Sequence, residues 1–334
     1  MLASPLLLAS PLLLASPPCA QLRGYAAVTP RSHLARMSAE TPSVSLLSFR
    51  PSLPPVDPAQ TPKLRALRTQ PSSPSWLEGV GLAFLAAGRL CVWDAQLDAV
   101  AELPSSGAAP PPASQIAIGA ATLLTCAASG LAAVDALSGG AVALPLEGAA
   151  AVGSPTAAAA LGDEKVLVAS GASGAVVCLG AAAAPVRLFD GVGGSVRSMC
   201  TSDGEKALWL AVDGAVLRAE LGLGLQAAPP VEVLPPSTGA VALATDRQGN
   251  LYACTPDGVR VFDEEGDEIL LISLPSPPSG CCFGGAGLST LLVTAADGIW
   301  SVSTRVQGVA PPTEAFRRKM DKYVSAGDFR HDGW

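Results

Sequence analysis

The sequence predicts an all-β protein, a six-bladed β-propeller built from four-stranded antiparallel blades around a central channel. After Trp76, a unit of one apolar strand, a small polar turn and a second apolar strand recurs six times. Successive second strands lie 33 to 43 residues apart, close to the length of one propeller blade. With 34 glycines and 30 prolines in the chain, no sustained helical stripe runs through this region.

The second strands locate the six repeats. They begin at Arg89, Thr122, Lys165, Ala207, Asn250 and Thr290. The fifth repeat shows the full pattern, with strands expected at 240–244, 251–255, 259–263 and 268–274 and a glycine in each of the three turns between them. Four strands joined by three hairpin turns make one blade, because glycine supplies the positive φ that such turns demand.

Six such sheets bury their faces only when they pack around a closed ring. Closure requires a strand on the outer edge of the last blade, and residues 64–68, just before the first blade, are expected to supply it. The expected boundaries are a targeting or disordered leader at 1–60, the propeller at 61–310 and a tail at 311–334. In the tail, Phe316 and Met320 share one side of an expected short helix.

The leader has the composition of a targeting segment. Residues 1–75 carry seven basic and two acidic groups, and a Leu-Ala-Ser-Pro-Leu-Leu phrase occurs twice near the start. These features favour import into an organelle, a plastid or a mitochondrion, followed by removal of the leader. Secretion and a disordered extension are the alternatives. No later segment approaches the roughly 20 apolar residues of a membrane span, so we expect no membrane partner.

The scarcity of certain residue types restricts the chemistry. Residues 76–310 carry nine basic and 22 acidic residues, a net charge of −13, which disfavours nucleic acid as a partner. The two histidines are His33 and His331, so a Ser-His-Asp or Cys-His site is not expected in the propeller. No phosphate-binding glycine loop occurs, and the eight cysteines form no Cys-x-x-Cys pair and are expected to be reduced and mostly buried.

Carboxylates and carbonyl oxygens remain as candidate ligands for a hard cation in the channel. Most acids have another explanation, because residues such as Asp203, Asp246 and Asp257 occupy expected turns. Glu78 is the exception. It follows Trp76 and is expected before the first inner strand, at the channel entrance. The alternative for Glu78 is an acid in a solvated loop.

Several phrases resemble those of the senescence-marker-protein, gluconolactonase and regucalcin family of six-bladed propellers. Leu-Glu-Gly-Val at 77–80, followed by Ala-Gly-Arg-Leu-Cys-Val-Trp-Asp at 87–94, is similar to the opening of that family. Ser-Asp-Gly-Glu-Lys-Ala-Leu-Trp at 202–209 and Asp-Arg-Gln-Gly-Asn-Leu-Tyr-Ala at 246–253 are similar to two of its turns, and Cys-Cys-Phe-Gly-Gly at 281–285 to its last inner strand. The resemblance covers residues 76–308 and is strongest after residue 196.

The resemblance implies hydrolysis of sugar lactones or related esters with one divalent cation, Ca²⁺, Zn²⁺, Mn²⁺ or Mg²⁺, in the channel. It also implies a Glu, an Asn and an Asp as metal ligands, and these positions fall on Glu78, Val196 and Thr238. Valine has no ligand atom and a neutral hydroxyl is a weak ligand. Glu78 is therefore the candidate metal ligand, with Thr238 as a substitute at the Asp position. The one Asn of the chain, Asn250, is expected in a turn.

Two functional hypotheses follow. The first is a degenerate metal-dependent hydrolase of sugar lactones or esters. The second is a non-catalytic propeller that binds a small molecule or a protein at the channel mouth. Aromatic residues make up 4% of the chain, which gives no stacking surface for nucleic acid. The expected partners are a lactone or another small molecule, or a protein, and the sequence indicates no oligomeric state.

Overall fold

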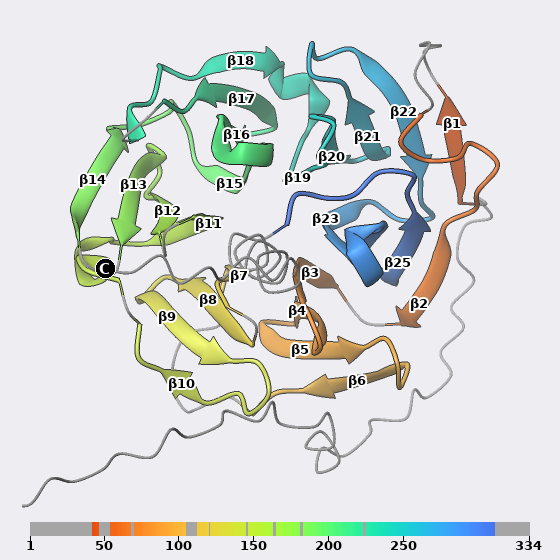
Figure 1. Ribbon diagram of the computed structural model, residues 1–334, viewed down its shortest axis with the longest axis horizontal. Helices are drawn as coiled ribbons and strands as arrows, with labels where there is room; N and C mark the ends of the chain where they lie inside the picture. Colours follow the sequence, from red (N-terminus) through yellow and green to blue (C-terminus); the bar gives the residue numbers. More distant parts are fainter. Residues whose placement is uncertain are drawn as a thin grey trace, which may run out of the picture.

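A computed structural model describes residues 42–46, 54–67, 70–104, 112–119, 121–144, 146–162, 165–180, 183–222 and 225–310. Within these ranges the chain forms six antiparallel sheets arranged in a ring (Figure 1). The predicted fold, a six-bladed β-propeller with a central channel, is confirmed. No helix in the described ranges is long and apolar enough to cross a membrane.

Blades 1 to 3 each consist of four consecutive strands, and the first strand of each lies next to the channel (Figure 1). Blade 1 contains β3 (Pro71–Leu77), β4 (Gly81–Ala86), β5 (Arg89–Asp94) and β6 (Ala99–Glu102). Blade 2 contains β7 (Ser114–Ala117), β8 (Thr122–Ala127), β9 (Gly130–Asp135) and β10 (Ala141–Val142). Blade 3 contains β11 (Pro155–Leu161), β12 (Lys165–Ser170), β13 (Ala175–Gly180) and β14 (Ala183–Phe189).

Blades 4 to 6 complete the ring, and the last two recruit strands from the N-terminal part of the chain. Blade 4 contains β15 (Val196–Thr201), β16 (Ala207–Val212), β17 (Ala215–Glu220) and β18 (Val231–Leu234). Blade 5 contains β19 (Ala242–Thr245), β20 (Leu251–Thr255), β21 (Gly258–Phe262) and β22 (Glu268–Ser273), with β1 (Ser43–Leu46) outside β22. Blade 6 contains β23 (Pro278–Gly284), β24 (Thr290–Ala295), β25 (Gly298–Ser303) and β2 (Lys63–Leu67).

Short 3-10 turns occupy some of the connections between strands. They are η2 (Ala149–Ala151), η3 (Asp203–Glu205), η5 (Pro236–Thr238) and η6 (Ala286–Leu288). The strands predicted for the fifth repeat agree with β19 to β22 to within two residues at each end. This agreement follows from the glycines of that repeat, since Gly249, Gly258 and Gly266 all have positive φ at its turns.

The first blade differs from the sequence prediction. Arg89–Asp94 is the third strand of blade 1 and not the second. The second strand is β4, whose Leu82 lies 41 residues before Leu123 of β8. This interval agrees with the 40 to 43 residues between the other repeats, so the predicted interval of 33 came from an assignment one strand too late. As a consequence, Glu78 follows the inner strand β3 instead of preceding it.

β2 closes the ring. It pairs antiparallel with β25, with Leu64 opposite Trp300, and covers the outer edge of blade 6 (Figure 1). The predicted closing strand at 64–68 is thereby confirmed, with a shift of one residue. Covering this edge leaves the main-chain groups of β25 paired on both sides.

The packed domain begins before the predicted boundary at residue 61. Val56 is fully buried in the core of blades 5 and 6. Arg305 forms an ion pair with Asp57 at 2.7 Å and donates its main-chain N–H to the carbonyl oxygen of Pro55. β1 pairs with β22. The rest of the predicted leader, including residues 1–41, and the predicted helix in 311–334 lie outside the described ranges.

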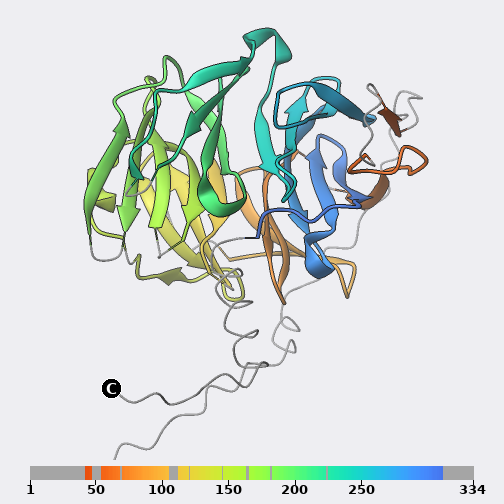
Figure 2. The ribbon, with the colours of Figure 1, turned by 45° about the horizontal axis from the view of Figure 1, so that its top comes forward.

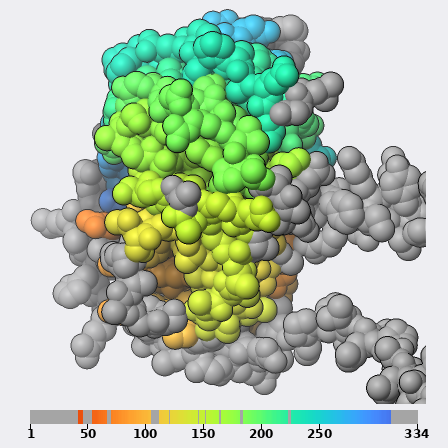
Figure 3. Space-filling model, turned by 90° about the vertical axis from the view of Figure 1, so that its left-hand side faces the viewer, coloured from red at the N-terminus to blue at the C-terminus, as the bar shows by residue number. Residues whose placement is uncertain are grey.

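Six buried apolar clusters, one between each pair of neighbouring blades, hold the ring together. The cluster between blades 6 and 1, for example, joins Phe84 and Trp93 to Leu292 and Ile299. Full burial of one such side chain contributes roughly 1.5–3 kcal/mol relative to exposure. The tilted view in Figure 2 shows the blades as adjoining sheets, and Figure 3 shows blades 2 to 4, from yellow to turquoise, following one another along the outside.

A buried carboxylate organises the turn between β19 and β20. Asp246 is fully buried and accepts hydrogen bonds from the main-chain N–H groups of Gln248 and Asn250. It also accepts from Asn250 Nδ2 at 2.7 Å and from Tyr252 Oη at 3.1 Å. Burial raises the pKa of this carboxyl, and the hydrogen bonds oppose that effect. The predicted turn acid is therefore an interior structural group.

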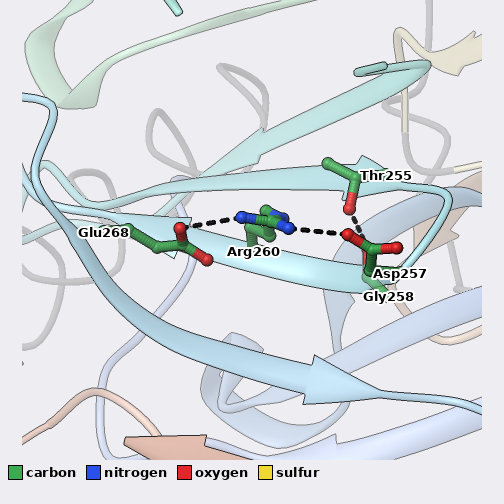
Figure 4. A network of polar contacts seen from close by, with 5 residues as sticks. All are labelled: Thr255, Asp257, Gly258, Arg260 and Glu268. Atoms are coloured by element: carbon green, nitrogen blue, oxygen red, sulfur yellow. Dashed lines mark hydrogen bonds and ion pairs between the residues drawn. The ribbon is translucent and has the colours of Figure 1, made fainter. Parts of the chain in front are cut away.

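Blade 5 also carries an ion-pair network on its outer part (Figure 4). Arg260 of β21 contacts Asp257 at 2.6 Å and Glu268 of β22 at 2.9 Å. Thr255 Oγ1 donates to the carbonyl oxygen of Gly258 at 3.0 Å in the same turn. Because Asp257 is largely exposed, we expect its pair with Arg260 to contribute about 1 kcal/mol or less.

Candidate functional site

The inner strands surround a cavity of about 250 Å³ in the channel. Its wall comes from all six blades: 73–76 of β3, 114–117 of β7, 157–160 of β11, 197–201 of β15, 241–245 around β19 and 279–283 of β23, together with Val309 and Ala310. This volume is slightly below the roughly 300–1,000 Å³ of pockets for drug-sized ligands. The cavity therefore suits a small molecule.

Bulges near the start of several inner strands change which side chains face the channel. The pairing of β15 with β16 passes from Val196 to Ser198, which leaves Arg197 in a bulge. Corresponding register shifts occur at Thr156 in β11 and Ser279 in β23. A bulge re-aims a side chain relative to a regular strand. Val196 is fully buried between blades 3 and 4, whereas Arg197 is exposed and lines the cavity.

Hydroxyl groups in the channel wall connect neighbouring inner strands. Ser75 Oγ of blade 1 donates to the carbonyl oxygen of Gln115 in blade 2 at 3.2 Å, and Ser114 Oγ donates to that of Thr156 in blade 3 at 2.9 Å. Further bonds of this kind link blades 4 and 5, through Thr245 Oγ1, and blades 6 and 1, through Ser279 Oγ. These hydroxyls hold adjacent blades together and are already engaged as donors.

Arg197 is the one charged side chain among the described residues that line the cavity. Three cysteines lie in the wall, and burial raises the pKa of two of them, Cys200 and Cys282, so far that both thiols stay protonated at neutral pH. The cavity thus presents a positive group among neutral polar and apolar neighbours, although the body of the chain is strongly acidic.

The three positions derived from the family resemblance lie outside the cavity wall. Glu78 is exposed in the turn between β3 and β4, which places it at the end of the inner strand, and Thr238 ends the 3-10 turn η5. Val196 faces the blade interface. Among the described residues, none of these three lines the cavity, and no group of three or more His, Cys, Asp or Glu is placed to hold a metal ion.

The residues present do not fit the divalent cation that the resemblance implies. Ca²⁺ takes about six to eight oxygen ligands that normally include carboxylates, and Zn²⁺ takes about four strong donors. Among the described residues, the wall contributes no carboxylate, and the hydroxyls of Ser75, Ser114 and Thr245 donate to carbonyl groups. The guanidinium of Arg197 would repel a cation in the same space.

Sequence reasoning missed Arg197 and Gln115 as cavity residues. One signal was available for Arg197, since an arginine within the apolar run that ends at Cys200 is out of place unless it faces water or a ligand. Gln115 gave a similar signal in the short strand before Ile116. In both cases, the strand pairing is needed to show which side of the strand meets the channel.

The fold and the cavity define this protein as a six-bladed β-propeller with a cavity in its central channel. Residues 239–297, which span parts of blades 5 and 6, match the family described as SMP-30/Gluconolactonase/LRE-like region. The predicted resemblance to this family is therefore confirmed. A gluconolactonase of Zymomonas mobilis is 42% identical over 65 residues, which are 19% of this chain and 18% of that protein. The chain thus matches less than a fifth of this relative's length.

Solved structures of similar shape show the same fold. A gluconolactonase from Xanthomonas campestris has a TM-score of 0.68 at 17% identity and covers 84% of this chain and 100% of its own. A calcium-binding protein, regucalcin, from Agrobacterium tumefaciens has a TM-score of 0.60 at 15% identity, with 74% of this chain and 94% of its own covered. At these identities the likeness concerns the fold.

Proposed function

We propose that this gluconolactonase-like propeller binds a small molecule in its channel without metal-dependent hydrolysis. The observation that carries the proposal is the composition of the cavity wall, in which Arg197 is the charged group contributed by the described residues. Hydrolysis of a lactone in this family's manner needs a cation to polarise the carbonyl and activate water. A positive side chain in the cavity supports binding of a ligand instead.

The second candidate is a metal-dependent sugar-lactone hydrolase. It is supported by the family match over residues 239–297 and by the gluconolactonase of Zymomonas mobilis, which is similar over 65 residues. Under this candidate, Glu78 and Thr238 stay the proposed ligands. Both candidates use the same fold, so chemistry must separate them.

We expect the full chain to leave the hydrolysis rate of a sugar lactone at its uncatalysed value, both without metal and with Ca²⁺, Zn²⁺, Mn²⁺ or Mg²⁺ added. The reason is that the cavity wall has no carboxylate, among the described residues, to hold the ion. A pH-stat assay of wild type and Glu78→Ala measures this. Metal-stimulated turnover in the wild type would favour the hydrolase, and its loss in Glu78→Ala would assign the metal to that residue.

A further inference from the structure

Arg197 differs from the other arginines of the propeller. Within residues 76–310, six arginines have an ion-pair or hydrogen-bond partner among the described residues: Arg89 with Glu102, Arg187 with Asp190, Arg218 with Glu220, Arg247 with Gln307, Arg260 with Asp257 and Glu268, and Arg305 with Asp57. For Arg197, none of the described residues provides a hydrogen bond or an ion pair to the guanidinium. Arg197 lines the cavity, and its guanidinium carries five N–H donors for which the described residues offer no acceptor.

An acid of the same blade contacts the chain two residues before Arg197, and it is already engaged. Asp213, in the turn between β16 and β17, accepts a hydrogen bond from the main-chain N–H of Ser195 at 3.3 Å. It does not line the cavity. Among the described residues, no acid pairs with the positive charge in the channel, and a planar guanidinium prefers a carboxylate or a phosphate, which it binds through paired hydrogen bonds.

A second group in the same cavity also lacks a partner. Gln115 of β7 is 3% exposed, and its Nε2 donates to the carbonyl oxygen of Ser73 at 3.2 Å. Its Oε1 is buried and has no hydrogen-bond partner. Leaving a buried acceptor without a donor costs free energy. Because Gln115 lines the cavity, we expect a hydroxyl group of a bound ligand to donate to Oε1.

We infer that the channel binds a small organic anion that also carries a hydroxyl group, with the anion on Arg197 and the hydroxyl donating to Gln115 Oε1. This inference rests on the proposed function, since it names the ligand class of the same cavity. The cavity of about 250 Å³ has the volume of roughly eight water molecules at ~30 Å³ each. A three-carbon hydroxy acid or a small sugar phosphate fits within this volume. Carboxylate and phosphate share the required chemistry.

The test is calorimetric titration of the metal-free full chain with four probes. Glycerate carries a carboxylate and hydroxyls, glycerol 3-phosphate carries a phosphate and hydroxyls, propionate lacks the hydroxyl, and glycerol lacks the charge. We expect saturable binding of glycerate or glycerol 3-phosphate, and the tighter of the two identifies the anion. Propionate and glycerol should bind more weakly, because each satisfies one of the two groups.

Variants assign the two contacts. Arg197→Gln should weaken anion binding by about tenfold or more, the loss expected for a charge-assisted hydrogen bond. Gln115→Leu should reduce the preference for glycerate over propionate. Arg187→Gln, which removes an exposed arginine of β14 paired with Asp190, is the matched control and should bind as the wild type does. Cooperative thermal unfolding of each variant shows that it is folded.

Two results would overturn the inference: binding of none of the anions by the wild type, or equal binding by Arg197→Gln and the wild type. Neither depends on the lactone assay. Metal-stimulated hydrolysis together with anion binding through Arg197 would refute the proposed function and leave the site in place. If the chain did not hydrolyse the lactone and Arg197→Gln bound the anion as tightly as the wild type, the proposed site would be refuted and the proposed function would stand.

Discussion

Starting the chain at residue 70 instead of residue 42 is expected to abolish cooperative folding of the propeller. The shorter chain loses β2, so the outer edge of β25 is left without a partner, and it also loses the fully buried Val56. Open edges promote pairing with other chains. We expect a loss on the order of 5 kcal/mol or more, which is comparable to the whole stability of many domains. Circular dichroism during thermal unfolding compares the two chains.

A point variant in the full-length chain gives the same comparison without truncation. Val56→Asp places a carboxylate at a position with no exposure, and we expect it to cost about 3 kcal/mol or more. Leu97→Asp, at a side chain that is 66% exposed, should change stability by about 0.5 kcal/mol or less. Equal unfolding temperatures for the chains that start at 42 and at 70 would show that the N-terminal strands do not close the ring.

Asp246→Ala is expected to lower the free energy of unfolding by about 3–5 kcal/mol at pH 7. The substitution removes the acceptor of four hydrogen bonds and leaves Asn250 Nδ2 and Tyr252 Oη buried without it. Each unsatisfied buried donor costs about 1–3 kcal/mol. Urea unfolding, followed by fluorescence, measures the change.

The control for Asp246→Ala is Asp203→Ala, which alters an exposed acid in the corresponding turn of blade 4. We expect the control to stay within about 0.5 kcal/mol of the wild type. If both variants lost the same small amount, the buried network would not be a main support of blade 5. The distinction matters because the main chain of Asp246 also forms an isolated antiparallel β-bridge with Gly308, where the chain leaves the last blade.

The fold was accessible from the sequence because a propeller repeats its local signals. Gly249, Gly258 and Gly266 mark the turns of the fifth repeat, and the strands between them have the predicted limits. Blade 1 lacks that spacing of turn residues. Gly88, just before Arg89, looks like the turn glycine ahead of a second strand, although the strand that follows it is the third of the blade. The short interval of 33 residues was the indication that this repeat was assigned one strand too late.

The site was less accessible, because it is assembled from single residues of six strands. The side of an inner strand that faces the channel depends on where its bulge lies, and the bulge places Arg197 in the channel and its neighbour Val196 in the core. Counting along family phrases led to Glu78 and Thr238, which lie in turns. The unpaired Oε1 of Gln115 is a property of packing and leaves no trace in the sequence.

Calorimetric titration of the full chain with Ca²⁺ tests most directly whether the channel is built for an anion or for a cation. A wall that offers a guanidinium and, among the described residues, no carboxylate predicts no saturable heat up to millimolar Ca²⁺. One-site binding of Ca²⁺ that disappears in Glu78→Ala would contradict this account and restore a metal centre at the channel mouth.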